Sequence, residues 1–423
     1  MRESKMLNKN EKEELLKVFT DLIKLDTQNP PGNEKPVTDY IQKLLKENGI
    51  ESSIYSKKDG RTNLYASIGK GEGVPIILLS HIDVVPAPGT WKHPPFEAVN
   101  DNGTIYGRGT LDTKHLTAMQ LMSMIWLARK NEELNRPVIL LATADEEGGS
   151  GYGMEFLSSE HPELIPKGYV ISEGGGFTIT QGNQRFRTCT CGEKGNCKMT
   201  LTVKESEAEC AFDPYGTMAG KLLKSIKNIC QYDAKERLTP PTKKFYNAVN
   251  GIIEDPTLKN LWQYSTRNCL AIDGYDIDFN SINQDEIKMG LTYQYIHGTE
   301  KEEITEMMEK LLEGCDAQYE IQSFSDGYEC DVNNPFIAKL EEVSMRYDSE
   351  TRLLPMIALG RTDGRFIKNN VYGYSPMLDD VPFSQVLKKI HQEDECITEE
   401  SLFYGTSVLY ETIKEIASSD INF

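Results

Sequence analysis

Two residues at the end of a short apolar segment could do chemistry together. His81 and Asp83 follow the run 76–79, whose continuous apolar character predicts a buried strand. Residues two positions apart in a strand point to the same side, so the imidazole and the carboxylate are expected to face one site. A carboxylate behind a histidine commonly orients a metal-binding imidazole. The pair therefore predicts a metal ligand, His81, and its orienting acid, Asp83.

Three further acidic residues also follow predicted strands. Glu146 and Glu147 come after the run 138–142, and Glu173 comes after the run 169–171. Sites in open α/β sheets form at the carboxyl ends of the strands, and like charges gathered there repel unless a cation joins them. Imidazole and carboxylate ligands without thiolate suit Zn²⁺, Mn²⁺ or Co²⁺. One residue of the adjacent pair could bind metal while the other acts as a general base on water.

Helices between these short strands must hold the candidate residues in place. A helix is predicted from Asn10, with Asn10 as its cap and Glu13 completing a capping box. Further helices are predicted up to Glu47 and over 116–129, 335–347 and 399–416. Helices that alternate with continuously apolar strands indicate an α/β sheet buried on both faces.

The pattern changes near Gly192. Residues 199–203 alternate like a half-exposed antiparallel strand, 214–229 and 301–312 are predicted helices, and 287–296 is strand-like. A polar loop is predicted around Pro240 and Pro241. This mixture predicts a small α+β domain inside the α/β domain, which resumes near Pro335.

Composition excludes several classes of protein. The chain has 423 residues and a net charge of −19, so two domains are expected, and neither nucleic acid nor an anionic membrane surface is expected as a partner. No apolar run reaches the length of a membrane span, and the charged start of the chain does not resemble a signal peptide. Nine scattered cysteines suggest reduced thiols, and hence a cytoplasmic location.

Six motifs occur in a fixed order along the chain. They are His81-x-Asp83 with Val84-Val85-Pro86, Gly107-Arg108-Gly109 with Asp112 and Lys114, Asp145-Glu146-Glu147, Ser172-Glu173-Gly174-Gly175, Thr362-Asp363-x-Arg365, and His391-x-x-Asp394-Glu395. This set resembles the M20 metallopeptidases, which include aminoacylase-1, carboxypeptidase S, glutamate carboxypeptidase and succinyl-diaminopimelate desuccinylase. The resemblance implies a zinc-peptidase-like α/β catalytic domain with a central mixed sheet, interrupted by a smaller, ferredoxin-like α+β lid domain. It places the catalytic domain at 1–191 and 328–423, and the lid at 192–327.

The resemblance also implies a role for each site residue. His81, Asp112 and Glu173 would hold one divalent metal ion, and Asp112, Glu147 and His391 would hold a second, with Asp112 bridging. Zinc is the expected metal, with manganese or cobalt as alternatives. Asp83 would orient His81, and Glu146 would be the general base. His93, His115 and His161 fit no ligand motif and are interpreted as loop or helix-surface residues.

The predicted lid departs from the family pattern. Cys210 stands where a lid histidine is expected, and Gln294 stands where an arginine would bind the substrate carboxylate, whereas Asn280 is retained. A thiol is a poor donor, and glutamine cannot make the bidentate charged pair of arginine. We interpret these three residues, with Gly360 and Arg365, as substrate-binding candidates. Arg365 could instead pair with Asp363.

Two functions remain open. The first is a metal-dependent hydrolase that cleaves an amide bond of a dipeptide or N-acyl amino acid, with a homodimer through the lid as an option. The alternative is a metal-binding homologue with little ordinary peptidase activity, acting as a partner or scaffold. Other donors on the lid, such as His297 or Lys288, would favour the first if they lay near the metals.

Overall fold

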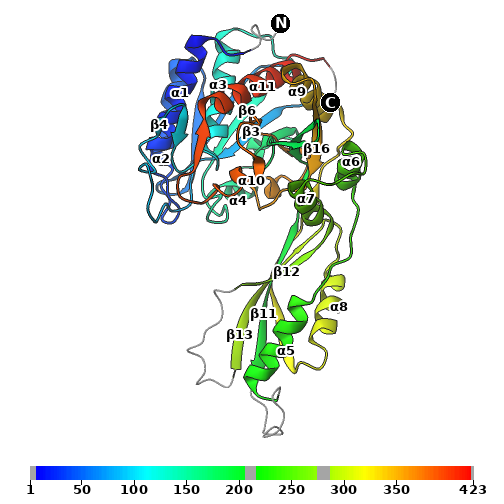
Figure 1. Cartoon of the computed structure of the whole chain (residues 1–423). Coiled ribbons are helices and arrows are strands. Elements are labelled where there is room, and N and C mark those ends of the chain that lie inside the picture. The colour runs from blue at the N-terminus through cyan, green and yellow to red at the C-terminus, as the bar shows by residue number, and fades with distance from the viewer. Residues whose placement is uncertain (1–5, 205–215, 274–285, 421–423) are drawn as a thin grey trace.

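A computed structural model describes residues 6–204, 216–273 and 286–420. The chain forms a broad upper lobe and an elongated lower lobe, joined by extended strands (Figure 1). The first and last parts of the chain lie together in the upper lobe, and the middle of the chain forms most of the lower lobe.

The upper lobe is built on a mixed sheet. Within the described residues, nine strands form this sheet in the order β1-β2-β6-β3-β7-β17-β9-β16, with β8 paired to β9. The bounds are Ser52–Lys58 (β1), Arg61–Ile68 (β2), Ile76–His81 (β3), Val138–Thr143 (β6), Tyr169–Ser172 (β7), Thr178–Gln181 (β8), Gln184–Thr190 (β9), Thr351–Met356 (β16) and Val371–Gly373 (β17). Strands β6, β3, β7 and β17 run parallel, whereas β1, β2 and β8 pair antiparallel with their neighbours. The predicted fold class is confirmed.

Parallel strands at the centre of the sheet position the candidate site. Every residue of β3, β6 and β7 is buried, as expected for strands covered on both faces. In register, Ser80 pairs with Ala142 and Leu78 with Ile171. The three strands therefore end close together, and the segments that follow them share one edge of the sheet.

Helices pack around this sheet (Figure 1). Helix α3 (Lys114–Arg129) is buried along nearly its whole length because it packs on β3 and β6 and is flanked by α1 and α11. Helix α1 is capped by Asn8, which forms a capping box with Glu11, so the predicted cap at Asn10 is wrong by two residues. The other bounds are Lys9–Lys24 (α1), Lys35–Glu47 (α2), Met154–Glu160 (α4), Pro335–Tyr347 (α9), Phe383–Val386 (α10) and Glu399–Ala417 (α11).

The lower lobe has its own sheet and core. Four strands of the described chain pair antiparallel in the order β12-β13-β11-β14. With helices α5 and α8 they follow the β-α-β-β-α-β order of a ferredoxin-like unit. A separate hydrophobic cluster that includes Met199, Leu291 and Ile304 fills this lobe. The bounds are Gly195–Lys204 (β11), Met218–Cys230 (α5), Cys269–Asp273 (β12), Glu286–Tyr295 (β13), Lys301–Leu312 (α8) and Ala317–Ser325 (β14).

Two helices follow α5, and the first of them occupies the segment around Pro240 and Pro241 that was predicted as a polar loop. Helices α6 (Pro240–Ala248) and α7 (Pro256–Thr266) each have a proline in the first turn, where the missing N–H is tolerated, so the prediction of a loop is wrong. Phe245 and Leu258 on these helices belong to the core of the upper lobe, and α6 packs on β16. The segment therefore returns to the upper lobe before the chain enters β12. The domain boundaries at 191 and 327 stay a prediction.

Short elements complete the fold. Strands β4 (Val99–Asp101), β5 (Thr104–Tyr106) and β18 (Cys396–Thr398) form a small sheet, and β10 (Gly192–Glu193) pairs with β15 (Tyr328–Glu329) where the chain passes between the lobes. Two 3₁₀ turns cover Pro162–Leu164 and Asp363–Phe366. None of the helices in the described ranges combines the length and apolar character needed to cross a bilayer.

Candidate metal centre

Acidic and imidazole side chains gather at the carboxyl edge of the parallel strands. His81 is the last residue of β3, Glu146 and Glu147 follow β6, and Glu173 follows β7. The distance from His81 Nε2 to Glu173 Oε2 is 3.5 Å. The sequence placed these residues at strand ends, and the order of the strands brings them together.

Asp112 lies between two histidines. Its Oδ1 is 3.0 Å from His81 Nε2, and its Oδ2 is 3.0 Å from His391 Nε2. His391 Nε2 also lies 3.2 Å from Glu147 Oε1. Each imidazole nitrogen therefore has Asp112 and one further carboxylate beside it, which is the arrangement expected around two neighbouring cations.

Two compact groups offer three donor atoms within 4.8 Å of one another, namely His81 with Asp112 and Glu147, and His81 with Glu146 and Glu173. These groups differ from the two ligand sets that the family resemblance implied, in which His391 stands in place of His81 in the set with Glu147, and Asp112 stands in place of Glu146 in the set with Glu173. In the pairwise contacts, Asp112 directs a different oxygen at each histidine, Glu173 lies beside His81, and Glu147 lies beside His391.

The pKa values also indicate a cation site. Burial opposes charge on His81, but Glu173 and Asp112 raise its pKa well above the usual range. Contacts with Asp112 and Glu147 raise the pKa of His391 to about 10, and burial raises that of Glu173 to about 7. Protons on these groups balance the negative charge, and a metal ion displaces such protons when it binds. The donor set therefore fits divalent metal.

Asp83 lies beside His81 and also holds the neighbouring loop. His81 Nδ1 lies 3.0 Å from the main-chain carbonyl oxygen of Asp83, but 3.6 Å from its carboxylate. The buried carboxylate accepts hydrogen bonds from Asn29 Nδ2 at 2.9 Å and from the amides of Glu146 and Glu147 at 3.1 and 3.2 Å. Asp83 thus joins the end of β3 to the loop that carries both glutamates.

Asp145, the residue before these glutamates, is also held by buried hydrogen bonds. Asp145 has a left-handed backbone with φ of 64°, which is uncommon for a residue other than glycine. Its carboxylate accepts hydrogen bonds from Asn29 Nδ2 at 2.8 Å and from Arg61 Nη2 at 2.6 Å. Arg61 also pairs with the buried Glu34 at 2.9 Å. These buried contacts hold the turn that directs Glu146 and Glu147 into the site.

Glu395 holds the turn that carries Asp112. It accepts hydrogen bonds from the amides of Leu111 at 2.6 Å and Asp112 at 3.2 Å, and it pairs with Arg108 at 2.7 Å. These contacts explain physically why the motifs at 107–114 and 391–395 occur together. The acid four residues after His391 fixes the turn that presents Asp112.

Arg365 contacts Glu146 rather than Asp363. Its Nη1 lies 3.2 Å from Glu146 Oε1, while Asp363 accepts hydrogen bonds from Ser150 Oγ at 2.6 Å and Thr143 Oγ1 at 2.7 Å. The suggested pairing of Arg365 with Asp363 is therefore wrong.

A cavity of about 350 Å³ opens onto the cluster. This volume suits a small organic molecule. Polar residues of the cluster line one part of the cavity, and apolar side chains line the rest. The lining comprises Leu111, Asp112, Thr113, His115, Glu146, Glu147, Glu173, Gly174, Gly175, Phe177, Ala358, Leu359, Gly360, Arg361, Thr362, Ser375, Phe383, Leu387, Ile390 and His391.

The predicted substrate-binding residues fall in different places. Gly360 lines the cavity. Gln294 lies in β13, opposite Asn196 and Cys269, and is absent from the described lining. Cys210 and Asn280 lie outside the described residues.

The two suggested lid donors do not reach the cavity either. His297 Nδ1 contacts the carbonyl oxygen of Gly327, and Lys288 pairs with Glu286. Neither belongs to the described lining of the cavity. They therefore give no support to the first of the two functions.

Sequence reasoning missed two polar groups at the cavity. His115, which was predicted to lie on a surface, is buried in α3, with Nε2 2.7 Å from Ser375 Oγ. Burial lowers its pKa to about 4, so the imidazole is neutral. Arg361 was not considered, although it lies beside Thr362 in one of the six motifs, and this position was the only available signal.

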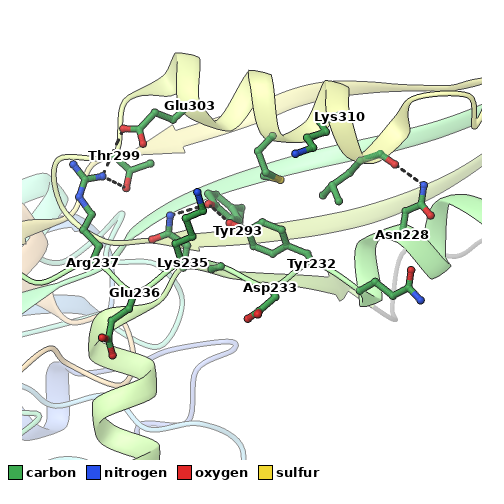
Figure 2. A pocket seen from close by; sticks show the side chains of 15 residues that line it. Asn228, Tyr232, Asp233, Lys235, Glu236, Arg237, Tyr293, Thr299, Glu303 and Lys310 are labelled. Carbon is green, nitrogen blue, oxygen red and sulfur yellow. Dashed lines mark hydrogen bonds and ion pairs between the residues drawn. The ribbon is translucent and has the colours of Figure 1, made fainter.

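A larger cavity, of about 600 Å³, lies in the lower lobe away from this cluster. Figure 2 shows it between α5, the segment 232–237 and α8. The Tyr232 and Tyr293 hydroxyls are 2.9 Å apart in its wall, and Asn268 donates to Tyr293 at 2.8 Å. Its charged lining residues have both signs and include none of the candidate metal ligands, so we assign the chemistry to the smaller cavity.

Comparisons with known proteins agree with this geometry. The model of peptidase family M20/M25/M40 matches residues 77–415. A probable succinyl-diaminopimelate desuccinylase of Staphylococcus epidermidis is 30% identical over 234 residues, and the alignment spans 53% of this chain and 54% of that protein, or about half its length. The succinyl-diaminopimelate desuccinylase of Orientia tsutsugamushi is 26% identical over 396 residues, covering 89% of this chain and 90% of that protein.

A solved structure shows the same fold. The YXEP protein of Bacillus subtilis, described as a dinuclear metal-binding peptidase from the M20 family, superposes with a TM-score of 0.61 at 15% identity, covering 97% of this chain and 99% of that chain. The family model spans most of the chain, and its range includes every candidate ligand from His81 to His391. The chain belongs to peptidase family M20/M25/M40.

Proposed function

We propose that this chain is a dinuclear metallohydrolase that cleaves an amide bond of a small substrate, such as a dipeptide or an N-acyl amino acid. The observation that carries this proposal is Asp112, which directs one carboxylate oxygen at each of two histidines. The relatives described as desuccinylases and the peptidase fold support the same class of reaction.

In this proposal, His81, Asp112 and Glu173 hold one metal ion, and Asp112, Glu147 and His391 hold the other. Two such cations would polarise the scissile carbonyl and acidify the attacking water. Zinc is the metal expected from the family, and manganese or cobalt would accept the same nitrogen and oxygen donors.

Glu146 is the proposed general base. It takes a proton from the attacking water and returns it to the leaving nitrogen. Arg365 Nη1, at 3.2 Å, holds one of its carboxylate oxygens and leaves the other available. Asp83 fixes the amides of Glu146 and Glu147 and so positions the loop.

The test is a substrate screen with the wild-type chain and Glu146→Gln. Both proteins are loaded with Zn²⁺, Mn²⁺ or Co²⁺ and incubated with dipeptides and N-acyl amino acids, and released amine is measured. The variant should retain metal and lose about 100- to 10,000-fold in kcat, the usual effect of general acid–base catalysis. The control is Glu163→Gln, since Glu163 is exposed. Equal rates for wild type and Glu146→Gln would refute this role.

A second candidate is a metal-binding homologue without ordinary peptidase activity. It is favoured by Gln294, which replaces the expected arginine and lies outside the cavity lining within the described residues. Ordinary turnover across the amide library would exclude it. A cytoplasmic location and dimerisation through the lid stay predictions.

A further inference from the structure

The larger cavity of the lower lobe offers two lysines to a ligand. Lys235 lies on the segment 232–237 and Lys310 lies on α8, and both line this cavity of about 600 Å³. Figure 2 shows them on different walls of the cavity, with the Tyr232 and Tyr293 side chains between the walls. Surface lysines are usually only solvated, and a ligand site needs further groups beside them.

The partners of the other charged side chains show which charges remain available. Each of the other four charged residues in the described lining has a partner. The pairs are Asp233 with Arg267 at 3.1 Å, Glu236 with Trp262 at 2.7 Å, Glu303 with the Glu300 amide at 3.0 Å, and Arg237 with the Gly298 carbonyl oxygen at 2.6 Å. Within residues 6–204, 216–273 and 286–420, neither Lys235 nor Lys310 has an ion pair or a side-chain hydrogen bond. The two ammonium groups are therefore the charges that can meet a ligand.

A chain of hydrogen bonds orients a hydroxyl in the same cavity. Asn268 Nδ2 donates to Tyr293 Oη at 2.8 Å, and the Tyr293 and Tyr232 hydroxyls are 2.9 Å apart. Tyr293 is 2% exposed, and burial together with its hydrogen bond to Tyr232 raises its pKa, so its hydroxyl remains protonated. Because a buried donor without an acceptor is costly, Tyr293 donates to Tyr232. The hydroxyl hydrogen of Tyr232 is then left to donate to a ligand.

The cavity also presents apolar surface. Met307 and Leu311 lie four residues apart on α8, so they share one face of the helix, and with Tyr232 they are only partly buried. The lining thus combines two cations, one hydroxyl donor and an apolar surface, in a volume that suits a small organic molecule.

We propose that this cavity is a second ligand site, which binds a small organic anion: a phosphate or carboxylate attached to an aromatic or aliphatic body. Lys235, Lys310 and the Tyr232 hydroxyl bind the anionic group, and Met307 and Leu311 contact the body. The lining includes none of the candidate metal ligands, so binding here is independent of the proposed hydrolase function.

The test is an NMR titration of metal-loaded protein that carries ¹³C-methyl methionine. Met307 lines the cavity, and Met122, in the core of the upper lobe, is the internal reference; Met307→Leu and Met122→Leu assign the two signals. Phenyl phosphate and phenylacetate combine an anion with a ring, inorganic phosphate lacks the ring, and benzyl alcohol lacks the charge.

A ring-bearing anion should shift the Met307 signal, and not that of Met122, with a Kd on the order of 1 mM. The tighter of the two ring-bearing anions distinguishes a phosphate from a carboxylate ligand. Inorganic phosphate and benzyl alcohol should each bind at least about tenfold more weakly, because each lacks one half of the proposed contacts.

Three variants remove the proposed polar contacts one at a time. Lys235→Gln, Lys310→Gln and Tyr232→Phe should each weaken binding of the tighter anion by about 3- to 10-fold. Lys227→Gln, at an exposed position on α5 outside the lining, should keep the wild-type Kd. Circular dichroism confirms that each variant folds.

Three results would each overturn the proposal. They are a Met307 signal that neither ring-bearing anion shifts, a wild-type Kd in the double variant Lys235→Gln/Lys310→Gln, and binding of benzyl alcohol as tight as that of the anions. Because the readout is a methyl group in the lower lobe, each of these results leaves the proposed hydrolase function standing.

Discussion

Replacing Asp83 by asparagine tests how the centre is held together. The substitution keeps the shape of the side chain, removes its charge, and replaces one acceptor oxygen by a donor. The native carboxylate is fully buried. Its Oδ1 accepts from the Glu146 amide, and its Oδ2 accepts from Asn29 Nδ2 and the Glu147 amide.

The expected loss of stability follows from these three hydrogen bonds. If the new NH₂ group takes the Oδ1 position, one hydrogen bond is lost, whereas in the other orientation two are lost. Hydrogen bonds to a charged group contribute about 1.5–3 kcal/mol each, so the better orientation still costs about that amount. Because the donor of the new side chain would face the amide of Glu146, the loop with both glutamates should shift. Metal affinity should fall by about 10- to 100-fold, as for other supporting residues of metal sites.

Two assays measure these effects separately. Urea unfolding of chelator-treated protein gives the change in unfolding free energy without metal, and competition with a chromophoric chelator gives metal affinity. Asp39→Asn is the control, because Asp39 pairs with Lys35 on an exposed helix face and the substitution should change stability by less than about 0.5 kcal/mol. An Asp83→Asn variant with the stability and the metal Kd of the wild type would refute the reasoning.

Three further predictions concern stability. Arg61→Met should lower the unfolding free energy by about 3–5 kcal/mol in a denaturant titration, since it leaves the buried Glu34 and Asp145 carboxylates unpaired; an unchanged midpoint would contradict this. Burial raises the pKa of Glu193 from 4.5 to about 7, so between these pH values the folded chain binds more protons than the unfolded chain, and its stability falls as pH rises. Glu193→Gln should reduce this fall in unfolding free energy by up to about 3 kcal/mol, and curves of stability against pH that run parallel for wild type and variant would rule the effect out. Removing metal should lower the unfolding free energy by about 4 kcal/mol relative to free metal at about 1,000 times its Kd, and identical calorimetric melting with and without chelator would count against a metal centre.

The sequence predicted most of the elements that carry the site because their signals are local. The apolar runs at 76–79, 138–142 and 169–171 all form buried strands. Helix α8 begins and ends where its periodicity predicted. The failure at 240–248 is also local, because the two prolines that suggested a loop, Pro240 and Pro241, occupy the first turn of α6, where proline is accepted.

Contacts between distant segments were not available to that reasoning. The spacing of His81 and Asp83 predicted a shared site, but not that the carboxylate would hold the Glu146 and Glu147 amides. The pairing of Arg365 with Glu146 depends on the docking of two loops that lie far apart in sequence. The sequence likewise gave no reason to separate Arg361 from other surface arginines.

The amino-acid sequence by itself predicted most of the strands and helices, the candidate ligands, and the family. Side-chain periodicity and strand-end positions are properties of short segments, so they can be read without a structure. The tertiary structure alone decided that Asp112 lies between His81 and His391, and that the cluster shares one cavity with apolar side chains. The physical reason is that strand order and loop docking, set by packing of the whole core, fix the distances between residues hundreds of positions apart.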